Sequence, residues 1–353
     1  MKSYDITEWG KPLQQAVRET PKPGPQEVLM RLRYCGVCHS DVHIREGYFD
    51  MGGGVKSQLG DRVKLPVVLG HEPIGVVAAV GAEVTGIRIG ETYLVNPWIG
   101  CGKCAVCLKG QDNLCNLMAA MGIARPGGFA THLMVPHARY LVDVKGIDPA
   151  RAAVLACSGV TAYSAAAKLG APEAGQWIAV LGCGGLGLIG IAILKALGHA
   201  NIIACDIDDT KLEAAKAAGV DHVLNLKTGG SAQLLALAGG GLHGMIDFVG
   251  APATSALAVP SLQKGGRLVS VGLFGGAATV PLVALAMREI SLMGSAVGST
   301  AQIRELVALV QSGKLKLPPV QVRPLSQAEQ SLRDLEAGRV TGRVVLDAMT
   351  ETD

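Results

Sequence analysis

Four cysteines are spaced closely enough to share one metal ion. They are Cys101, Cys104, Cys107 and Cys115. Four thiolates within one loop can surround Zn²⁺ as a tetrahedron and leave no coordination position open, which is the arrangement of a structural zinc site. An iron–sulfur cluster would also use four thiolates, but nothing in the sequence indicates a redox partner for it. The spacing therefore predicts a structural zinc in the loop 101–115.

Three further residues of metal-ligand type lie far apart in the chain. Cys38 opens the run Cys-His-Ser-Asp-Val-His, His71 follows Gly70, and Cys157 precedes Ser-Gly-Val-Thr. Cysteine and histidine side chains are the usual ligands of zinc in proteins. The three positions are 33 and 86 residues apart. Spacing alone therefore leaves open whether they share a metal ion or lie separately.

A glycine-rich segment joins a predicted strand to a predicted helix. It reads Gly182-Cys183-Gly184-Gly185-Leu186-Gly187. In such a loop the first glycine makes a tight turn, the second lets the backbone approach a pyrophosphate, and the third lets the helix pack closely on the strand. The helix N-terminus adds free N–H groups and a partial positive charge. The pattern predicts a dinucleotide-binding site.

The type of dinucleotide is indicated by Asp206, which lies 19 residues beyond Gly187 at the end of the next predicted strand. A carboxylate there can accept hydrogen bonds from the adenosine ribose hydroxyls, and it repels a 2′-phosphate. No arginine occurs in residues 207–211. We therefore expect NAD rather than NADP. Cys183 and Cys205, which flank this site, are expected to be small core residues.

The elements that must position these residues fall into two sets. From about residue 176, short apolar runs alternate with helical patterns, which is typical of a parallel sheet flanked by helices. Strands are predicted at 178–181, 202–205, 222–225, 245–249, 267–271 and 290–293, and helices at 186–197, 210–218, 231–237 and 254–262. Six strands with crossover helices form one doubly wound domain.

The first 150 residues follow another pattern. Short β-like runs at 28–34, 74–80 and 131–135 are separated by Gly and Pro, which predicts an irregular antiparallel or barrel-like domain. Beyond the doubly wound set, a helix is predicted at 302–310 and a strand at 339–346, and this strand is expected to return to the first domain. We divide the chain into a β-rich domain (1–150), a doubly wound domain (151–290) and a return segment (291–353).

Composition excludes some classes of function. The net charge of the 353 residues is only +3, without a basic block, so nucleic-acid binding is not expected. Two uncharged stretches, 177–194 and 268–287, are long enough to suggest membrane spans, but glycines break both, so each is predicted to be a strand, a turn and a second element. Two acids among the first eight residues disfavour a secretory signal, and nine cysteines, an odd number, disfavour a disulfide framework. We expect a cytoplasmic protein.

Together these motifs resemble those of the zinc-dependent medium-chain alcohol dehydrogenases, over essentially the whole chain. The resemblance implies an α/β fold with a GroES-like β-rich catalytic domain, a Rossmann domain that binds NAD, and an active site in the cleft between them. It implies an enzyme that interconverts small alcohols with ketones or aldehydes. It also implies a homo-oligomer, more often a tetramer than a dimer.

The same resemblance implies a metal site that the spacing left open. Cys38, His71 and Cys157 would hold a catalytic zinc, with the fourth position left for water or substrate. Glu72 would be a nearby carboxylate that can approach the metal. Two zinc ions per chain are thus expected. Zinc in such a site acts as a Lewis acid that lowers the pKa of a bound alcohol.

Further roles are implied near the reacting carbon. Ser40 would hydrogen-bond the substrate oxygen, and His43 would pass the proton to solvent through the nicotinamide ribose. Asp41 would orient His71.

For the cofactor, the resemblance places His39 and Arg343 on the pyrophosphate. It places Lys211 beside Asp206 at the ribose, and Thr161 near the nicotinamide.

The sequence departs from the yeast-type members of the family in two places. The segment 48–70 is longer, and is either a substrate-cleft flap with Phe49 and Met51 facing the substrate or a disordered surface loop. Position 40 is Ser in place of Thr, and the missing methyl group should help secondary or cyclic alcohols to bind. Trp98 either lines the pocket or packs in the core.

Three alternatives remain open from the sequence. They are a polyol dehydrogenase, an enzyme that works physiologically as an aldehyde or ketone reductase, and a non-catalytic relative that retains zinc and NAD.

Overall fold

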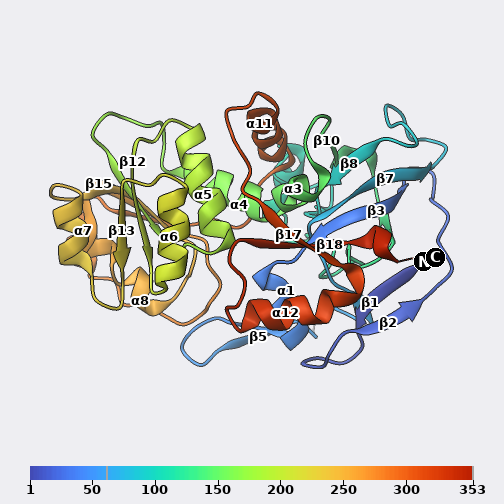
Figure 1. The fold of residues 1–353 in the computed structure, drawn as a ribbon, viewed down its shortest axis with the longest axis horizontal. Helices are drawn as coiled ribbons and strands as arrows, with labels where there is room; N and C mark the ends of the chain where they lie inside the picture. Colours follow the sequence, from blue (N-terminus) through green and yellow to red (C-terminus); the bar gives the residue numbers. More distant parts are fainter. Residues whose placement is uncertain (61–62, 352–353) are drawn as a thin grey trace.

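The computed structural model describes residues 1–60 and 63–351. Figure 1 shows two lobes, with the parallel sheet on the left and a β-rich lobe on the right. The two ends of the described chain lie close together on the β-rich lobe, where Lys2 Nζ pairs with Glu351 Oε2 at 3.3 Å.

Six parallel strands form the sheet of the first lobe, in the order β13-β12-β11-β14-β15-β16. They are β11 (Trp177–Leu181), β12 (Asn201–Asp206), β13 (His222–Asn225), β14 (Leu242–Asp247), β15 (Leu262–Ser270) and β16 (Ser291–Gly294). The order reverses between β11 and β14, and ligands of such sheets bind at this switch point. The predicted doubly wound fold is confirmed.

Helices flank this sheet. They are α4 (Ser158–Lys168), α5 (Gly185–Ala196), α6 (Asp209–Ala217), α7 (Ser231–Leu237), α8 (Pro252–Ser255), α9 (Ala258–Ser261) and α10 (Leu282–Met287). The predicted helices at 186–197, 210–218 and 231–237 are confirmed to within one residue. The predicted single helix at 254–262 is wrong, because Pro260 has no N–H to donate to the carbonyl of Ala256 and two short helices form instead.

The two long uncharged stretches form separate elements, as predicted. The first contains β11 and most of α5, and the second contains the end of β15 and then α10. Among the described residues, no helix combines the length and the apolar character needed to cross a membrane.

The β-rich lobe contains a seven-stranded sheet in the order β10-β8-β7-β3-β18-β17, with β9 also paired to β3. Its strands are β3 (Val28–Gly36), β7 (Pro73–Val80), β8 (Thr92–Val95), β9 (His132–Val135), β10 (Leu141–Asp143), β17 (Val320–Pro324) and β18 (Arg343–Asp347). The long strand β3 is antiparallel to β7, β9 and β18. The antiparallel architecture predicted for the first 150 residues is therefore confirmed.

Smaller elements complete this lobe. β1 (Lys2–Ile6), β2 (Gln14–Val17) and β6 (Val67–Val68) form a small sheet, and β4 (Tyr48–Asp50) pairs with β5 (Lys56–Gln58) as a hairpin. The helix α1 (His39–Glu46) follows β3.

The C-terminal strand β18 pairs with β3 and so returns to the β-rich lobe, as predicted. Before it come α11 (Thr300–Gln311), which corresponds to the helix predicted at 302–310, and α12 (Ala328–Glu336). One boundary needs correction. Residues 291–294, which we placed in the return segment, form β16 and pair in parallel with β15, so they complete the doubly wound sheet.

A shared core joins the lobes. Ile74 and Leu94 from the β-rich sheet lie in the same buried cluster as Leu155, Val160 and Ile303. Apolar packing therefore fixes the junction at which segments of both lobes meet.

Candidate active site and metal centres

Cys38, His71 and Cys157 meet at this junction, with their ligand atoms all within 4.8 Å of one another. Cys38 is the N-cap of α1, His71 precedes β7, and Cys157 precedes α4. His71 is fully buried, and its Nε2 has no hydrogen-bond partner within the described residues. A buried nitrogen without a partner is costly unless it binds something. Two thiols and this imidazole form a donor set that suits zinc.

The two thiols are in contact, which affects their protonation. The pKa of Cys38 lies well below its usual range because the Cys157 thiol hydrogen-bonds to it, and His71 contributes in the same direction. The thiolate is the form of cysteine that binds a metal. The arrangement therefore favours metal binding at Cys38.

Asp41, in the first turn of α1, is fully buried and holds both ligand segments. Its Oδ1 lies 3.0 Å from Nδ1 of His71 and accepts the N–H of Gly70 at 3.3 Å. Its Oδ2 accepts the N–H of Cys38 at 2.9 Å. A carboxylate in this position fixes the ring and leaves Nε2 facing the two thiols.

Glu72 is also fully buried. Its Oε1 accepts hydrogen bonds from the backbone N–H and the hydroxyl of Ser158, each at 3.1 Å, and its Oε2 pairs with Arg343. Burial raises the pKa of Glu72. Both oxygens of the expected alternate metal ligand are therefore engaged by neighbours in this structure.

Arg343 was expected on the cofactor pyrophosphate, and here its guanidinium binds Glu72. Its aliphatic stem nevertheless lies against the glycine-rich loop, because a Cβ on Gly185 would overlap Cδ of Arg343. Arg343 therefore contacts both Glu72, which lies beside the thiols, and the glycine-rich loop of the predicted dinucleotide site.

Trp98 packs in the core, beside the candidate metal site. It is 5% exposed, and its ring lies 5.7 Å from that of His71, centroid to centroid. Its Nε1 donates to the carbonyl oxygen of Ala156 at 3.0 Å. The indole packs in a cluster with Ala120, Cys157, Cys38, Met118, Ile123 and Val297. Trp98 thus braces two ligand segments and forms part of an apolar wall beside them.

The helix α1 carries three further candidates. Ser40 is half-buried and His39 is exposed. The ring of His43 is 5.5 Å from the ring of His39 and 5.5 Å from that of Phe49. Burial lowers the pKa of His43, so its imidazole is neutral at neutral pH and can both accept and donate a proton.

Within the segment 48–70, residues 48–58 form the hairpin β4–β5 and Val67–Val68 form β6, while residues 61 and 62 lie outside the described residues. The hairpin and the loops after β14 and β15 enclose a cavity of about 440 Å³. Phe49 is half-buried in its wall, whereas Met51 is 63% exposed at its rim. This arrangement favours the flap over a disordered loop.

The glycine-rich loop has the predicted geometry. Gly182 adopts φ of 89°, Gly184 is the N-cap of α5, and a Cβ on Gly187 would overlap the carbonyl oxygen of Gly182. Cys183 and Cys205 are fully buried core residues, as predicted.

Asp206 lies at the end of β12 and accepts backbone N–H groups from Cys183 at 2.7 Å, Ile207 at 2.8 Å and Asp208 at 3.1 Å. These bonds hold the carboxylate beside the loop. Lys211 is half-buried on α6, and Thr161 is buried on α4 with no partner for its hydroxyl among the described residues.

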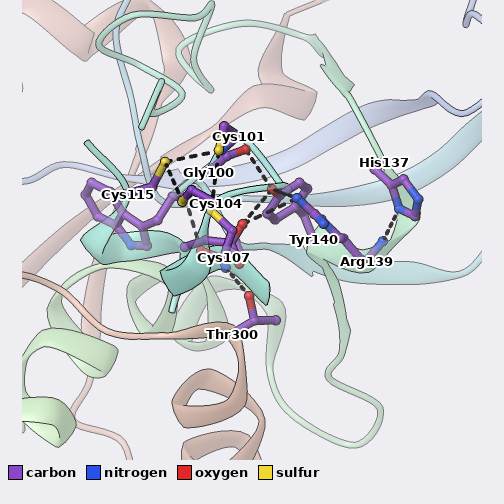
Figure 2. Close-up of polar contacts among 12 residues, drawn as sticks. Gly100, Cys101, Cys104, Cys107, Cys115, His137, Arg139, Tyr140 and Thr300 are labelled. Atoms are coloured by element: carbon purple, nitrogen blue, oxygen red, sulfur yellow. Dashed lines mark hydrogen bonds and ion pairs between the residues drawn. The ribbon is translucent and has the colours of Figure 1, made fainter. Parts of the chain in front are cut away.

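The four cysteines of the loop 101–115 also converge, and Figure 2 shows their sulfur atoms grouped together. The sulfur atoms are 4.0 Å apart in Cys101–Cys107 and 3.8 Å apart in Cys104–Cys115. A tetrahedron with zinc–sulfur bonds of about 2.3 Å has edges of about 3.8 Å, so the group fits zinc. Backbone N–H groups of Lys103 and Cys104 lower the pKa of Cys101 to about 6.

Neighbouring side chains hold this cysteine loop in place. The hydroxyl of Tyr140 donates to Oδ1 of Asp112 at 3.0 Å. It also lies 3.4 Å from the carbonyl oxygen of Gly100 (Figure 2). Arg139 pairs with Asp112 at 3.3 Å.

Comparison with known proteins identifies the family. Residues 24–146 match the family model described as the alcohol dehydrogenase GroES-like domain, and residues 185–312 match that of the zinc-binding dehydrogenases. An NAD-dependent alcohol dehydrogenase of Sulfurisphaera tokodaii is 35% identical over 348 residues, which cover 98% of this chain and 99% of that protein. The chain belongs to the zinc-dependent medium-chain alcohol dehydrogenases.

Solved structures of the family agree in fold. The alcohol dehydrogenase of Aeropyrum pernix has a TM-score of 0.89 and 32% identity, and the match covers 98% of this chain and 100% of that one. The acetophenone reductase of Geotrichum candidum, solved with NAD, has a TM-score of 0.84 and 30% identity over 98% and 96% of the two chains. This alcohol dehydrogenase is thus a zinc-dependent enzyme that transfers hydride between an alcohol and NAD.

Sequence reasoning did not identify Ser158 or Val297 as site residues. Ser158 could have been suspected, because it follows a predicted ligand and starts a helix. Val297 carries no local signal, since only the tertiary fold brings it to Trp98.

Proposed function

We propose that this alcohol dehydrogenase interconverts secondary or cyclic alcohols that carry apolar substituents with the corresponding ketones. The observation that carries the proposal is the apolar wall around the thiols of Cys38 and Cys157, formed by Trp98, Ala120, Met118, Ile123 and Val297. Such a wall offers no partners to the extra hydroxyls of a polyol, whose desolvation would go uncompensated. Ser40, smaller than Thr, leaves more room at the reacting carbon.

A similar solved structure also supports a substrate with apolar substituents. The similar acetophenone reductase is named for an aryl ketone, and an aryl substituent suits an apolar wall.

In this proposal Cys38, His71 and Cys157 would hold the catalytic zinc, and the four cysteines of the loop 101–115 a second one. Bound at the first site, zinc supplies Lewis acidity that lowers the pKa of the substrate hydroxyl. Asp41 keeps Nε2 of His71 directed at the site. Ser40 accepts the hydrogen bond of the substrate hydroxyl, and neutral His43 carries the proton towards solvent.

The cofactor would lie on the loop Gly182–Gly187 at the N-terminus of α5. The backbone N–H groups of Gly184, Gly185, Leu186 and Gly187 would face the pyrophosphate there. Asp206 and Lys211 would hold the adenosine ribose, His39 and Arg343 would approach the pyrophosphate, and Thr161 would contact the nicotinamide.

The test is NADH formation from NAD⁺ across primary, secondary, cyclic and polyol substrates, with ketone reduction measured in parallel. We expect kcat/KM for apolar secondary or cyclic alcohols to exceed that for polyols by about tenfold or more, since each unpaired hydroxyl costs on the order of 1–3 kcal/mol. A preference for polyols would overturn the proposed substrate class, and a lack of turnover with every alcohol would overturn the assignment of the site.

We also propose that the enzyme is a homo-oligomer. Strand β16 is the edge of the parallel sheet, so its outer hydrogen-bonding groups can pair with the same strand of a second copy. Leu292 on this strand is 39% exposed. The neighbouring helix α10 exposes Leu282, Val283 and Met287. Such a patch is typical of an interface.

A second apolar surface supports a tetramer rather than a dimer. Leu108, Leu114 and Leu117 of the cysteine loop region are all more than half exposed. Light scattering during size-exclusion chromatography should give about four times the 36.4 kDa chain mass. Met287→Arg should dissociate the β16 interface, whereas Val17→Arg, at an exposed position on β2, should not. A monomeric wild type would contradict the proposal.

We infer a reducing compartment, the cytoplasm, as the place of action. All nine cysteines are free thiols, and seven of them belong to the two ligand groups. Oxidation of either group would remove ligands. Recovery of the native enzyme in the cytoplasmic fraction of cells tests this inference, and its recovery outside the cytoplasm would contradict it.

A further inference from the structure

The segment 295–299, between β16 and α11, passes directly beside the candidate catalytic site. Val297 packs with Trp98 and Cys157 in the apolar wall. Its φ is 45°, a left-handed conformation that a β-branched residue rarely adopts. Such backbone strain persists only where the surroundings impose it. The contacts that hold this segment therefore determine the shape of the wall.

Three contacts restrain the segment from different sides. The Nδ2 of Asn113 donates to the carbonyl oxygen of Ala296 at 3.3 Å. The Nζ of Lys168 donates to the hydroxyl of Ser295 at 2.9 Å. Gly298 packs so tightly on Val160 that a Cβ would overlap it.

Asn113 is notable because it belongs to the cysteine loop. It lies in the short 3₁₀ turn η1 (Asp112–Leu114), two residues before Cys115. Its neighbour Asp112 accepts a hydrogen bond from the hydroxyl of Tyr140. The position of Asn113 is therefore set by the fold of the four-cysteine loop.

The orientation of the Asn113 amide is also determined. Its Oδ1 is buried and has no hydrogen-bond partner within the described residues. Reversal of the amide would place two oxygens against each other at Ala296 and bury an unpaired NH₂ group. The donor therefore faces Ala296, and the carbonyl of Ala296 is its one partner within the described residues.

We propose that Asn113 is a positioning residue through which the folded four-cysteine loop, by binding the carbonyl oxygen of Ala296, fixes Val297 in the apolar wall. The hydrogen bond holds the backbone immediately before Val297, where the strain lies. Without it, the segment can relax and the wall beside Trp98 loosens. The consequence for substrate selection rests on the function proposed above, whereas the consequence for the packing of Trp98 does not.

The test uses variants that separate the hydrogen bond from the volume of the side chain. Asn113→Asp keeps the volume and removes the donor, and Asn113→Gln keeps a donor. The matched control is Asn201→Ala, which removes a similar bond, from Nδ2 to the carbonyl oxygen of Gln176 at 3.1 Å, at the start of β12. Zinc content is measured for every variant.

The first readout is independent of turnover. Trp9 and Trp177 are replaced by Phe, so that Trp98 alone reports by fluorescence. In Asn113→Asp we expect a red shift of its emission and stronger quenching by acrylamide, because the wall admits solvent. We expect no change in Asn201→Ala and recovery in Asn113→Gln.

The second readout is kinetic. Loss of one hydrogen bond should raise KM for a bulky ketone about three- to tenfold, with kcat nearly unchanged. If Asn113→Asp behaves like Asn201→Ala in both readouts, the proposal is overturned. Loss of zinc from both Asn113→Asp and Asn113→Gln would also overturn it, because the residue would then serve the cysteine loop alone. If the wild type reduces no ketone, the proposed function fails, while Trp98 fluorescence still decides the role of Asn113.

Discussion

The buried carboxylate of Asp41 determines which nitrogen of His71 faces the two thiols. It binds Nδ1 of the imidazole and, through its other oxygen, the backbone of Cys38. One residue therefore sets the orientation of one ligand and the backbone position of another. At the scale of single residues, the site depends on this carboxylate as much as on the ligands.

Asp41→Asn should weaken metal binding at this site. The amide loses the negative charge that supports the imidazole, and such changes typically lower metal affinity about 10–100-fold. Competition with a chelator, followed by zinc content, measures the effect. Asp50→Asn, on the hairpin, is the control, and equal zinc retention in the two variants would contradict the role of Asp41.

Asp206→Gly should shift cofactor preference towards NADP. Removal of the carboxylate removes its repulsion of a 2′-phosphate, and we expect the ratio of kcat/KM for NADP to that for NAD to rise about tenfold. Asp221→Gly is the control, because Asp221 likewise accepts a backbone N–H, that of Ile202 at 2.8 Å, on the same sheet. An unchanged ratio would remove Asp206 from the ribose contact.

At the scale of elements, α5 must begin directly against β11 to present its N-terminus to a ligand. Gly187 makes this possible, because its Cα lies so close to the carbonyl of Gly182 that no side chain fits. Gly184 has an ordinary φ of −71°, and a Cβ at this position would meet no other atom within 4 Å. The two glycines therefore serve different purposes.

Their substitution should separate folding from cofactor binding. Gly187→Ala should cost about 1–3 kcal/mol of unfolding free energy, because the helix must move off the strand. Gly184→Ala should leave stability nearly unchanged but weaken NADH binding, because the added methyl group stands where the pyrophosphate approaches. Urea unfolding and a fluorescence titration with NADH measure the two effects. If both variants changed stability and NADH binding to the same extent, the two glycines would not have separate roles.

At the scale of the whole molecule, the candidate active site exists only because two lobes share a core. Cys38 and His71 come from the β-rich lobe, and Cys157 comes from the segment that leads into the doubly wound one. The four-cysteine loop also contacts the surroundings of this site, because Asn113 donates a hydrogen bond to Ala296 in the segment 295–299.

Cys104→Ser should therefore affect stability more than chemistry. Loss of one of four thiolates should release the second zinc and lower Tm by about 5 °C or more. Metal analysis and thermal unfolding measure both. Cys205→Ala, which removes a buried thiol outside both ligand groups, should retain the full zinc content. If Cys104→Ser kept its zinc and its Tm, the structural role of the loop would be wrong.

Features that depend on residues close together in the chain could be predicted from the amino-acid sequence. Short apolar runs located the strands of the doubly wound sheet, and helical periodicity located most of its helices, because both patterns lie within a few consecutive residues. The glycine-rich loop and the four-cysteine group could be recognised for the same reason, because the residues of each motif lie close together in the chain. The prediction of one helix at 254–262 was wrong because apolar periodicity does not register the missing N–H of Pro260.

Features that depend on contacts between distant segments became visible in the folded protein alone. Spacing could not bring Cys38, His71 and Cys157 together, because 33 and 86 residues of intervening chain allow many arrangements. The pairing of Arg343 with Glu72 and the contact of Asn113 with Ala296 are of the same kind. They arise where packing of the shared core brings separate loops within hydrogen-bond distance, and no local pattern encodes that meeting.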